Sequence, residues 1–117
     1  MLFWLAAAGL LGSLARYWTS RAVARLTSSE FPFGTMAANW IGSFLTGRLA
    51  GTATLYLPPV AAIAALSGFL GAYTTFSTFT FETVALARSG ERKMAIWNFS
   101  ANVIGGAAFA LLGALVA

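Results

Sequence analysis

The sequence contains no cysteine and no histidine among its 117 residues. Without cysteine the chain cannot form a disulfide framework or a thiolate metal site, and without histidine it lacks the usual general base and proton shuttle. Only three residues are acidic, and charged residues make up 9% of the chain, against about 25% in soluble domains. We therefore do not expect an enzyme, because no set of nucleophile, base and orienting group can be assembled from these residues.

Apolar residues are abundant instead, at 59% of the chain with a mean hydropathy of +0.79. A membrane-spanning helix takes roughly 20 apolar residues, so we expect an all-α membrane protein whose residues 1–117 form one domain of four transmembrane helices. The predicted spans are about Leu2–Ala24, Gly34–Ala53, Pro59–Ala87 and Met94–Val116. The first is interpreted as a retained span and not a signal peptide, because no basic residue precedes it.

The third predicted span contains an unusual segment, Gly68 to Glu82 (GFLGAYTTFSTFTFE). From Thr74 to Thr80, five of seven side chains carry a hydroxyl, and Thr and Phe are mediocre helix formers. We predict a helix broken near the bilayer centre, between about Gly71 and Thr78. Broken membrane helices lie buried in protein or line watery cavities, and their freed backbone groups form ion sites.

Two stripes of polar side chains accompany the break. Thr35, Asn39 and Ser43 are spaced four apart in the second span, and Asn98 and Asn102 are spaced four apart in the fourth, followed by Gly106. Such spacing places each set on one helix face. The stripes either line a hydrated path or simply bond between helices, as polar residues in membranes often do; together with the break, they favour the path.

Four ionisable residues fall within the spans, where charge is costly and often functional. Arg21 and Arg48 lie near span ends, from which they can reach the headgroups. Arg16 is deeper, and it either pairs with Glu82 or stands at a vestibule that attracts anions. The Asn amides, the hydroxyls and the electropositive ring edges of phenylalanines suit an anion better than a cation.

Three segments of the chain resemble the Fluc (CrcB) family of fluoride channels. Gly9–Tyr17 (GLLGSLARY) is similar to its first-helix motif, Phe33–Gly47 (FGTMAANWIGSFLTG) to its second-helix motif, and Gly68–Glu82 to its third-helix signature. The resemblance covers essentially the whole chain. It implies four helices per subunit, an antiparallel (inverted) dimer with two fluoride pores, and a structural sodium ion (Na⁺) at the dimer centre.

The resemblance also implies roles for individual residues. It places the sodium ion on the backbone carbonyls of Gly71 and Thr74, and Arg16 at the vestibule. The residues implied to line the fluoride pore are Asn39, Phe76, Phe79, Ser77, Thr78, Asn98 and Asn102. Asn98 departs from the family, in which a pore-facing Tyr is common at this position, so a hydrogen-bond donor is kept but an aromatic wall is lost.

Basic residues are distributed unevenly between the loops. Arg25, Arg88, Arg92 and Lys93 lie in or beside the loops after spans one and three, whereas the other side has only Arg48. The positive-inside rule then favours termini outside the cell. Two alternatives follow: a homodimer that inserts both ways, or a heterodimer with a paralogous subunit of opposite charge bias.

We expect a passive, fluoride-specific channel of the plasma (inner) membrane, which exports fluoride and relieves its toxicity. One alternative is a proton-coupled exporter of small cationic drugs, but this class needs a carboxylate in the first span, where the chain has Arg16. Another is a scaffold protein, which does not explain the break. The net charge of +4 is accounted for by basic residues beside the spans, and nucleic acid is not an expected partner.

Overall fold

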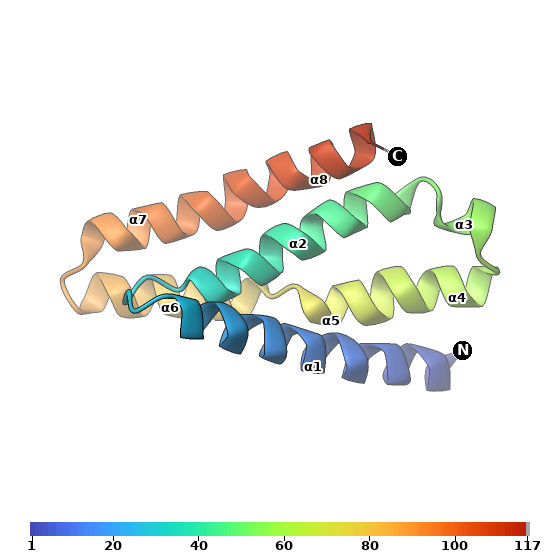
Figure 1. The fold of residues 1–117 in the computed structure, drawn as a ribbon, viewed down its shortest axis with the longest axis horizontal. Helices are drawn as coiled ribbons and strands as arrows, with labels where there is room; N and C mark the ends of the chain where they lie inside the picture. Colours follow the sequence, from blue (N-terminus) through green and yellow to red (C-terminus); the bar gives the residue numbers. More distant parts are fainter. Residues whose placement is uncertain (117) are drawn as a thin grey trace.

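The computed structural model describes residues 1–116, and these form an elongated bundle of helices measuring 49 × 30 × 23 Å. The main helical segments, here called the first to fourth rods, are Leu2–Leu26, Phe33–Ala50, Pro59–Arg88 and Arg92–Leu115. They run along the long axis of the bundle (Figure 1), and no strand occurs in the described part of the chain. The elements are α1 (Leu2–Leu26), α2 (Phe33–Ala50), α3 (Ala53–Tyr56), α4 (Pro59–Ile63), η1 (Ala64–Leu70), α5 (Gly71–Tyr73), α6 (Phe76–Arg88), α7 (Arg92–Ser100), η2 (Ala101–Gly105) and α8 (Gly106–Leu115).

The rods correspond to the predicted spans, with differences at the ends. The second predicted span, about Gly34–Ala53, was wrong at its C-terminal end. Helix α2 ends at Ala50, and a turn at Gly51 and Thr52 leads into the short α3. Pro59 occupies the start of α4, where its missing N–H costs nothing. The π-helical segments η1 and η2 within the third and fourth rods were not predicted.

Two of the four rods are long and apolar enough to cross a membrane. Within Pro59–Arg88 and within Arg92–Leu115, an 18-residue stretch has a mean hydropathy of 1.4, and 28% and 22% of these stretches, respectively, are buried inside the protein. The first two rods are less apolar, since α1 carries arginines such as Arg16 and α2 carries Asn39 and Arg48. By length and composition, the third and fourth rods are therefore candidates for membrane spans.

Burial is the reverse of that in a soluble protein. Trp97 is 70% exposed, whereas the neighbouring Asn98 is fully buried. Buried polar residues also include Thr35, Asn39 and Asn102. An apolar exterior around hydrogen-bonded polar residues is what a lipid solvent favours.

The predicted break in the third rod is confirmed, and it is shorter than expected. Helix α5 ends at Tyr73, α6 begins at Phe76, and only Thr74 and Thr75 are extended, a gap that is visible in Figure 1. Thr75 starts α6, since its side chain accepts a hydrogen bond from the Thr78 N–H, as N-cap threonines do. Gly71 itself is helical, with φ −61°.

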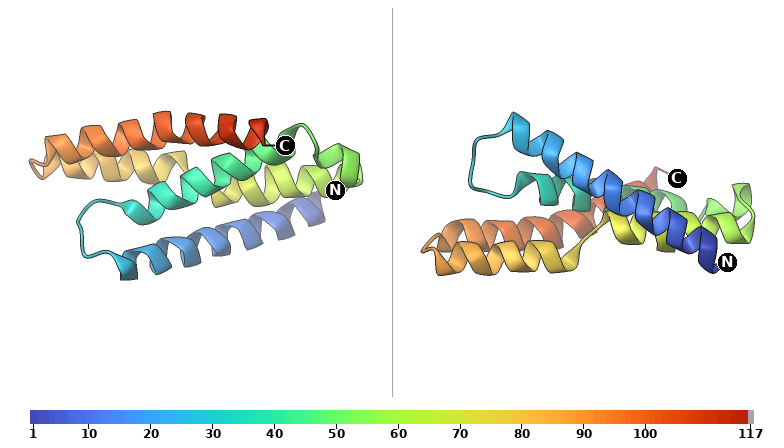
Figure 2. Two further views of the ribbon diagram at one scale, coloured as in Figure 1. Left: turned by 45° about the horizontal axis from the view of Figure 1, so that its top comes forward. Right: turned by 90° about the horizontal axis from the view of Figure 1, so that it is seen from below.

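The rods pack through glycines. Helix α8 lies along α2, and a Cβ placed on Gly47 or Gly113 would collide with backbone atoms of Ala110 or Phe44, respectively. Gly12 of α1 lies equally close to the backbone of Phe69 in η1. The first half of the third rod thus packs on α1, whereas α6 packs on α7 (Figure 2). Small residues permit this approach of helices in lipid.

Candidate functional site

The break in the third rod is held by one side chain, Asn39 of α2. Thr75 has extended backbone angles, φ −147° and ψ 120°, so its N–H and C=O point to one side as they do in a β-strand. Asn39 Oδ1 accepts from the Thr75 N–H at 2.7 Å, and Asn39 Nδ2 donates to the Thr75 carbonyl at 3.0 Å. The side chain therefore pairs with the break as a neighbouring strand would.

The two predicted polar stripes meet at Asn39. Its Nδ2 also donates to Asn102 Oδ1 at 2.7 Å. Asn102 Nδ2 donates to the Asn98 carbonyl and to Asn98 Oδ1, at 2.8 and 3.1 Å. Asn98 Nδ2 then donates to Thr83 Oγ1 at 2.9 Å and to the Phe79 carbonyl at 3.3 Å. This chain of amides joins α2, the fourth rod and α6, on the C-terminal side of the break.

The amide chain uses all of its donors internally. Each Asn side chain has two N–H donors, and those of Asn39, Asn98 and Asn102 all bond to protein oxygens. In this conformation the amides thus hold the break in place. An anion can receive a bond from Asn39 or Asn102 only by replacing one of these oxygen acceptors.

An open cavity of about 350 Å³ lies over the break. Its lining combines hydroxyls, amides and two aromatic rings: Asn39, Ser43, Thr46, Thr74, Thr75, Phe76, Phe79, Asn102 and Ala110. Ser43 makes no hydrogen bond among the described residues, whereas Thr46 donates to the Gly42 carbonyl and Thr74 to the Leu70 carbonyl. We call the surface formed by these nine lining residues the polar face.

The two phenylalanines of the polar face differ in exposure. Phe76 is 71% exposed and Phe79 only 4% exposed, and the rings meet edge to face with centroids 4.9 Å apart. Phe79 also contacts the ring of Phe99 on α7, 6.2 Å away. Phe76 therefore projects from the subunit while Phe79 forms part of its interior.

The carbonyls of Gly71 and Thr74 lack their usual helical partners. In a continuous helix they would bond to the N–H groups of Thr75 and Thr78. Those donors are directed elsewhere, to Asn39 Oδ1 and to Thr75 Oγ1, respectively. Freed carbonyl oxygens suit a hard cation such as sodium, so the donor set at the break fits the implied ion.

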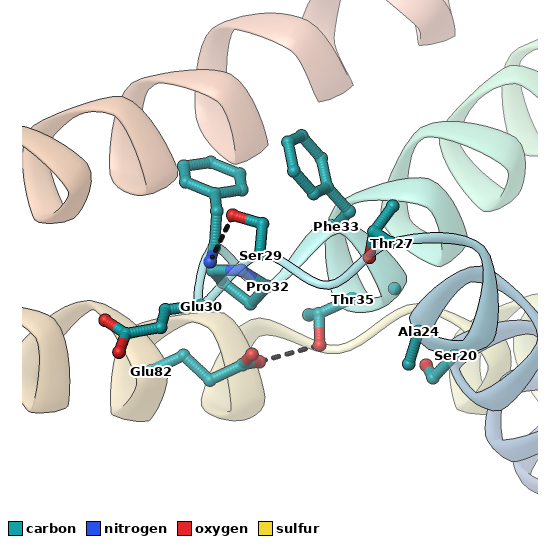
Figure 3. A pocket seen from close by; sticks show the side chains of 11 residues that line it. Ser20, Ala24, Thr27, Ser29, Glu30, Pro32, Phe33, Thr35 and Glu82 are labelled. Carbon is teal, nitrogen blue, oxygen red and sulfur yellow. Dashed lines mark hydrogen bonds between the residues drawn. The ribbon is translucent and has the colours of Figure 1, made fainter.

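A second cavity, of about 320 Å³, lies where α1 ends, α2 begins and α6 passes (Figure 3). Thr35 Oγ1 donates to Glu82 Oε1 across it at 2.6 Å. Ser20, Thr27, Ser29 and Glu30 also line it. Thr35 lies one helical turn before Asn39, so this cavity and the polar face are lined from the same side of α2.

Several predicted site residues lie outside both cavities. Ser77 and Thr78 are exposed near the start of α6, and Asn98 is buried behind Asn102. Arg16 is partly exposed in the middle of α1 and lines neither cavity. The alternative in which Arg16 pairs with Glu82 is not observed, since no ion pair joins them among the described residues and Glu82 bonds to Thr35.

Sequence reasoning missed two residues of this site. Thr75 was counted only as one of several hydroxyls, although a threonine three residues before Thr78 at a helix restart is an N-cap signal. Thr83 supplies the last acceptor of the amide chain, and its Oγ1 donates to the Phe79 carbonyl at 2.7 Å. Nothing in the sequence distinguishes Thr83 from an ordinary helical threonine.

Comparisons with known proteins agree on one family. The family model described as "CrcB-like protein, Camphor Resistance (CrcB)" matches residues 3–114. A protein of Moorella thermoacetica named "Fluoride-specific ion channel FluC 2" is 41% identical over 93% of this chain and 89% of its own length. A protein of the same name from Mycobacterium bovis is 44% identical over 93% and 84%, and "Fluoride-specific ion channel FluC" of Citrifermentans bemidjiense is 39% identical over 99% and 95%.

Proposed function

Since the chain belongs to the CrcB family, whose relatives are named fluoride-specific ion channels, we propose that it conducts fluoride passively across a membrane. The family is one of ion channels and not of enzymes. This membership also sets aside the drug exporter and the scaffold. The observation that carries the proposal within the structure is the polar face, a hydrogen-bonding surface at the only break in the third rod.

The path begins at the cavity of Thr35 and Glu82 and follows α2 to the polar face. Fluoride is a small anion that accepts strong hydrogen bonds, and it loses water on entering a narrow pore. The Ser43 hydroxyl is available as a donor, and the amides of Asn39 and Asn102 become donors when the ion displaces an internal oxygen. The electropositive ring edges of Phe76 and Phe79 supply the remaining contacts.

All four rods cross the membrane in this proposal, and a second copy in inverted orientation covers the polar face. In a single subunit, the Ser43 hydroxyl of this open cavity and the freed carbonyls of Gly71 and Thr74 would face lipid without hydrogen-bond partners, which is costly. Phe76, at 71% exposed, would then insert into the partner. The partner is either the same chain or a paralogous subunit, since the loops carry the charge bias described above.

The sodium ion belongs to the same assembly. The carbonyls of Gly71 and Thr74 from two copies would hold it at the centre of the dimer, where it would neutralise carbonyl dipoles and join the two breaks. The ion would be structural and not transported.

The direction of transport follows from acid chemistry. Hydrogen fluoride crosses the plasma membrane in neutral form and dissociates in a neutral cytoplasm, so the anion accumulates inside. A passive channel lets it leave down its gradient, which relieves its toxicity without an energy source.

The test is fluoride efflux from liposomes that contain only this purified chain, read with a fluoride electrode. Rapid efflux of fluoride but not chloride supports the channel and establishes a working homodimer. If folded protein gives no efflux, adding the paralogous subunit tests the heterodimer. No fluoride efflux in either case would refute the proposal.

A further inference from the structure

An apolar groove lies on the other side of the contact between α2 and the fourth rod, away from the polar face. It consists of two adjoining cavities of about 550 and 450 Å³, and Trp40 is a wall of both. Met36, Trp97 and Ile104 line the first cavity, and Phe44 lines the second. We call the two cavities together the Trp40 groove.

The floor of the Trp40 groove is fixed by specific contacts. The Trp40 Nε1 donates to the Ala101 carbonyl of η2 at 2.8 Å, and its ring stacks on Phe109 with centroids 4.9 Å apart. The indole also lies directly against Gly105, where a Cβ would collide with it. Since the indole N–H is already bonded, the groove offers only apolar surface and the Ser100 hydroxyl.

Two basic residues lie at the start of α7, beyond the residues that line the groove. Lys93, Trp97, Ser100 and Ile104 follow one another on α7 and η2 at spacings of four, three and four, which is one face of a helix. Lys93 and its neighbour Arg92 are exposed at the loop end of this stripe. The loops after α1 and after α6 carry four basic residues in or beside them and two acidic residues, Glu30 and Glu91. Their net charge is therefore +2.

We propose that the Trp40 groove binds one phospholipid with an anionic headgroup. An acyl chain lies along the groove past Trp40, and the phosphate contacts Lys93 and Arg92. Trp97 lies between the two parts of the lipid, at the depth where tryptophan is enriched in membrane proteins. Basic residues beside a membrane surface attract anionic lipids. Arg92 and Lys93 would therefore select the anionic headgroup, and the apolar groove would accommodate the acyl chain.

The inference requires the proposed membrane insertion but not fluoride conduction. Its test uses tryptophan quenching by phospholipids brominated in the middle of the acyl chain. The variant Trp4→Phe/Trp18→Phe retains Trp40 and Trp97, because the chain has four tryptophans. It is reconstituted in phosphatidylcholine vesicles with rising fractions of brominated phosphatidylglycerol or brominated phosphatidylcholine.

We expect phosphatidylglycerol to quench at lower fractions than phosphatidylcholine. Replacing Arg92 and Lys93 together by Gln should remove this preference. The affinity for phosphatidylglycerol relative to phosphatidylcholine should fall about fivefold for each charge removed. The matched control is Arg25→Gln. Arg25 is an exposed basic residue in the last turn of α1, and it is not on the helix face of Lys93 and Trp97. Its replacement should leave the preference unchanged.

Equal quenching by both lipids in the parent variant, or a preference that survives loss of Arg92 and Lys93, would overturn the inference. Absence of quenching by either lipid would also overturn it, because the groove would then admit no acyl chain. A companion variant retaining only Trp4, which is 58% exposed on α1, reports insertion by its own quenching. Fluoride efflux from the same vesicles tests the proposed function separately.

Discussion

Asn39 and Thr75 form a two-point contact in which one side-chain amide replaces a strand partner, with bonds of 2.7 and 3.0 Å. The contact lies at the only interruption of the third rod, and Asn39 extends it through Asn102 into the fourth rod. The break is thus held by α2 and is not a consequence of weak helix propensity alone. Its extended backbone frees the carbonyls before it and starts α6 after it.

Asn39→Asp tests this contact. The carboxylate keeps an acceptor for the Thr75 N–H, but it places negative oxygens against the Thr75 carbonyl and Asn102 Oδ1, where Nδ2 now donates. We expect the free energy of unfolding to fall by about 1–3 kcal/mol, measured by thermal melting of the purified protein. Ser43→Ala, one turn along α2, is the control and should melt like the parent. Unchanged melting of Asn39→Asp would mean that the break is held by other contacts.

Phe76→Ile and Phe79→Ile should both reduce fluoride efflux, because each removes an electropositive ring edge from the proposed path. The two variants should differ in stability. Phe76 is 71% exposed on the subunit and Phe79 only 4%, so the replacement of Phe76 should lower the melting temperature less than that of Phe79. A loss of ring-edge contacts worth about 1.4 kcal/mol would slow efflux about tenfold. The measurement is efflux from liposomes at equal protein content.

The control for both variants is Phe81→Ile. Phe81 lies on α6 as well and is 74% exposed, but it does not line the polar face. Its replacement should leave efflux at the parent rate. Normal efflux in both Phe76→Ile and Phe79→Ile would indicate that these rings only pack.

The sequence predicted the break because its cause is local. Hydroxyl residues, two glycines and phenylalanines within Gly68–Glu82 all weaken a helix, so the position could be read without knowing the fold. Its length was overestimated, because Gly71 was taken to leave the helix. In the structure Gly71 has ordinary helical angles and is the first residue of α5.

The partners of the polar side chains could not be predicted in the same way. The two stripes were identified from spacing, yet spacing does not tell that Asn39 meets both Thr75 and Asn102. Those contacts depend on how closely α2 approaches the fourth rod. Gly47 and Gly113 permit this close approach, because neither has a side chain between the two backbones. Spacing alone does not distinguish one glycine from another either, since Gly47 lies against Ala110 whereas Gly51, four residues later, faces open space.

The glycines of the α2–α8 contact provide a further prediction. A methyl group at Gly113 or Gly47 would collide with the backbone of the facing helix, which cannot move as a side chain can. We expect Gly113→Ala to lower the free energy of unfolding by about 1–3 kcal/mol and to disturb the bond between Asn39 and Asn102. The matched control is Gly51→Ala, where nothing lies within 4 Å. Equal melting temperatures of the two variants would contradict the close approach of the helices.

Removal of sodium should destabilise the assembled protein if the carbonyls of Gly71 and Thr74 hold the ion. A ligand that binds only the folded state stabilises it by an amount that grows with the logarithm of its concentration, about 2.7 kcal/mol at a hundred times its dissociation constant. We expect the melting temperature to fall when sodium is replaced by N-methylglucamine at constant ionic strength, which keeps charge screening equal. Asn39→Asp is the internal control, because it loses the bond from Nδ2 to the Thr75 carbonyl that helps to fix the break, and the sodium dependence should weaken with it. A melting temperature independent of sodium in the parent would show that the freed carbonyls at the break serve another purpose, since their helical donors are directed to Asn39 and Thr75 whether or not an ion is bound.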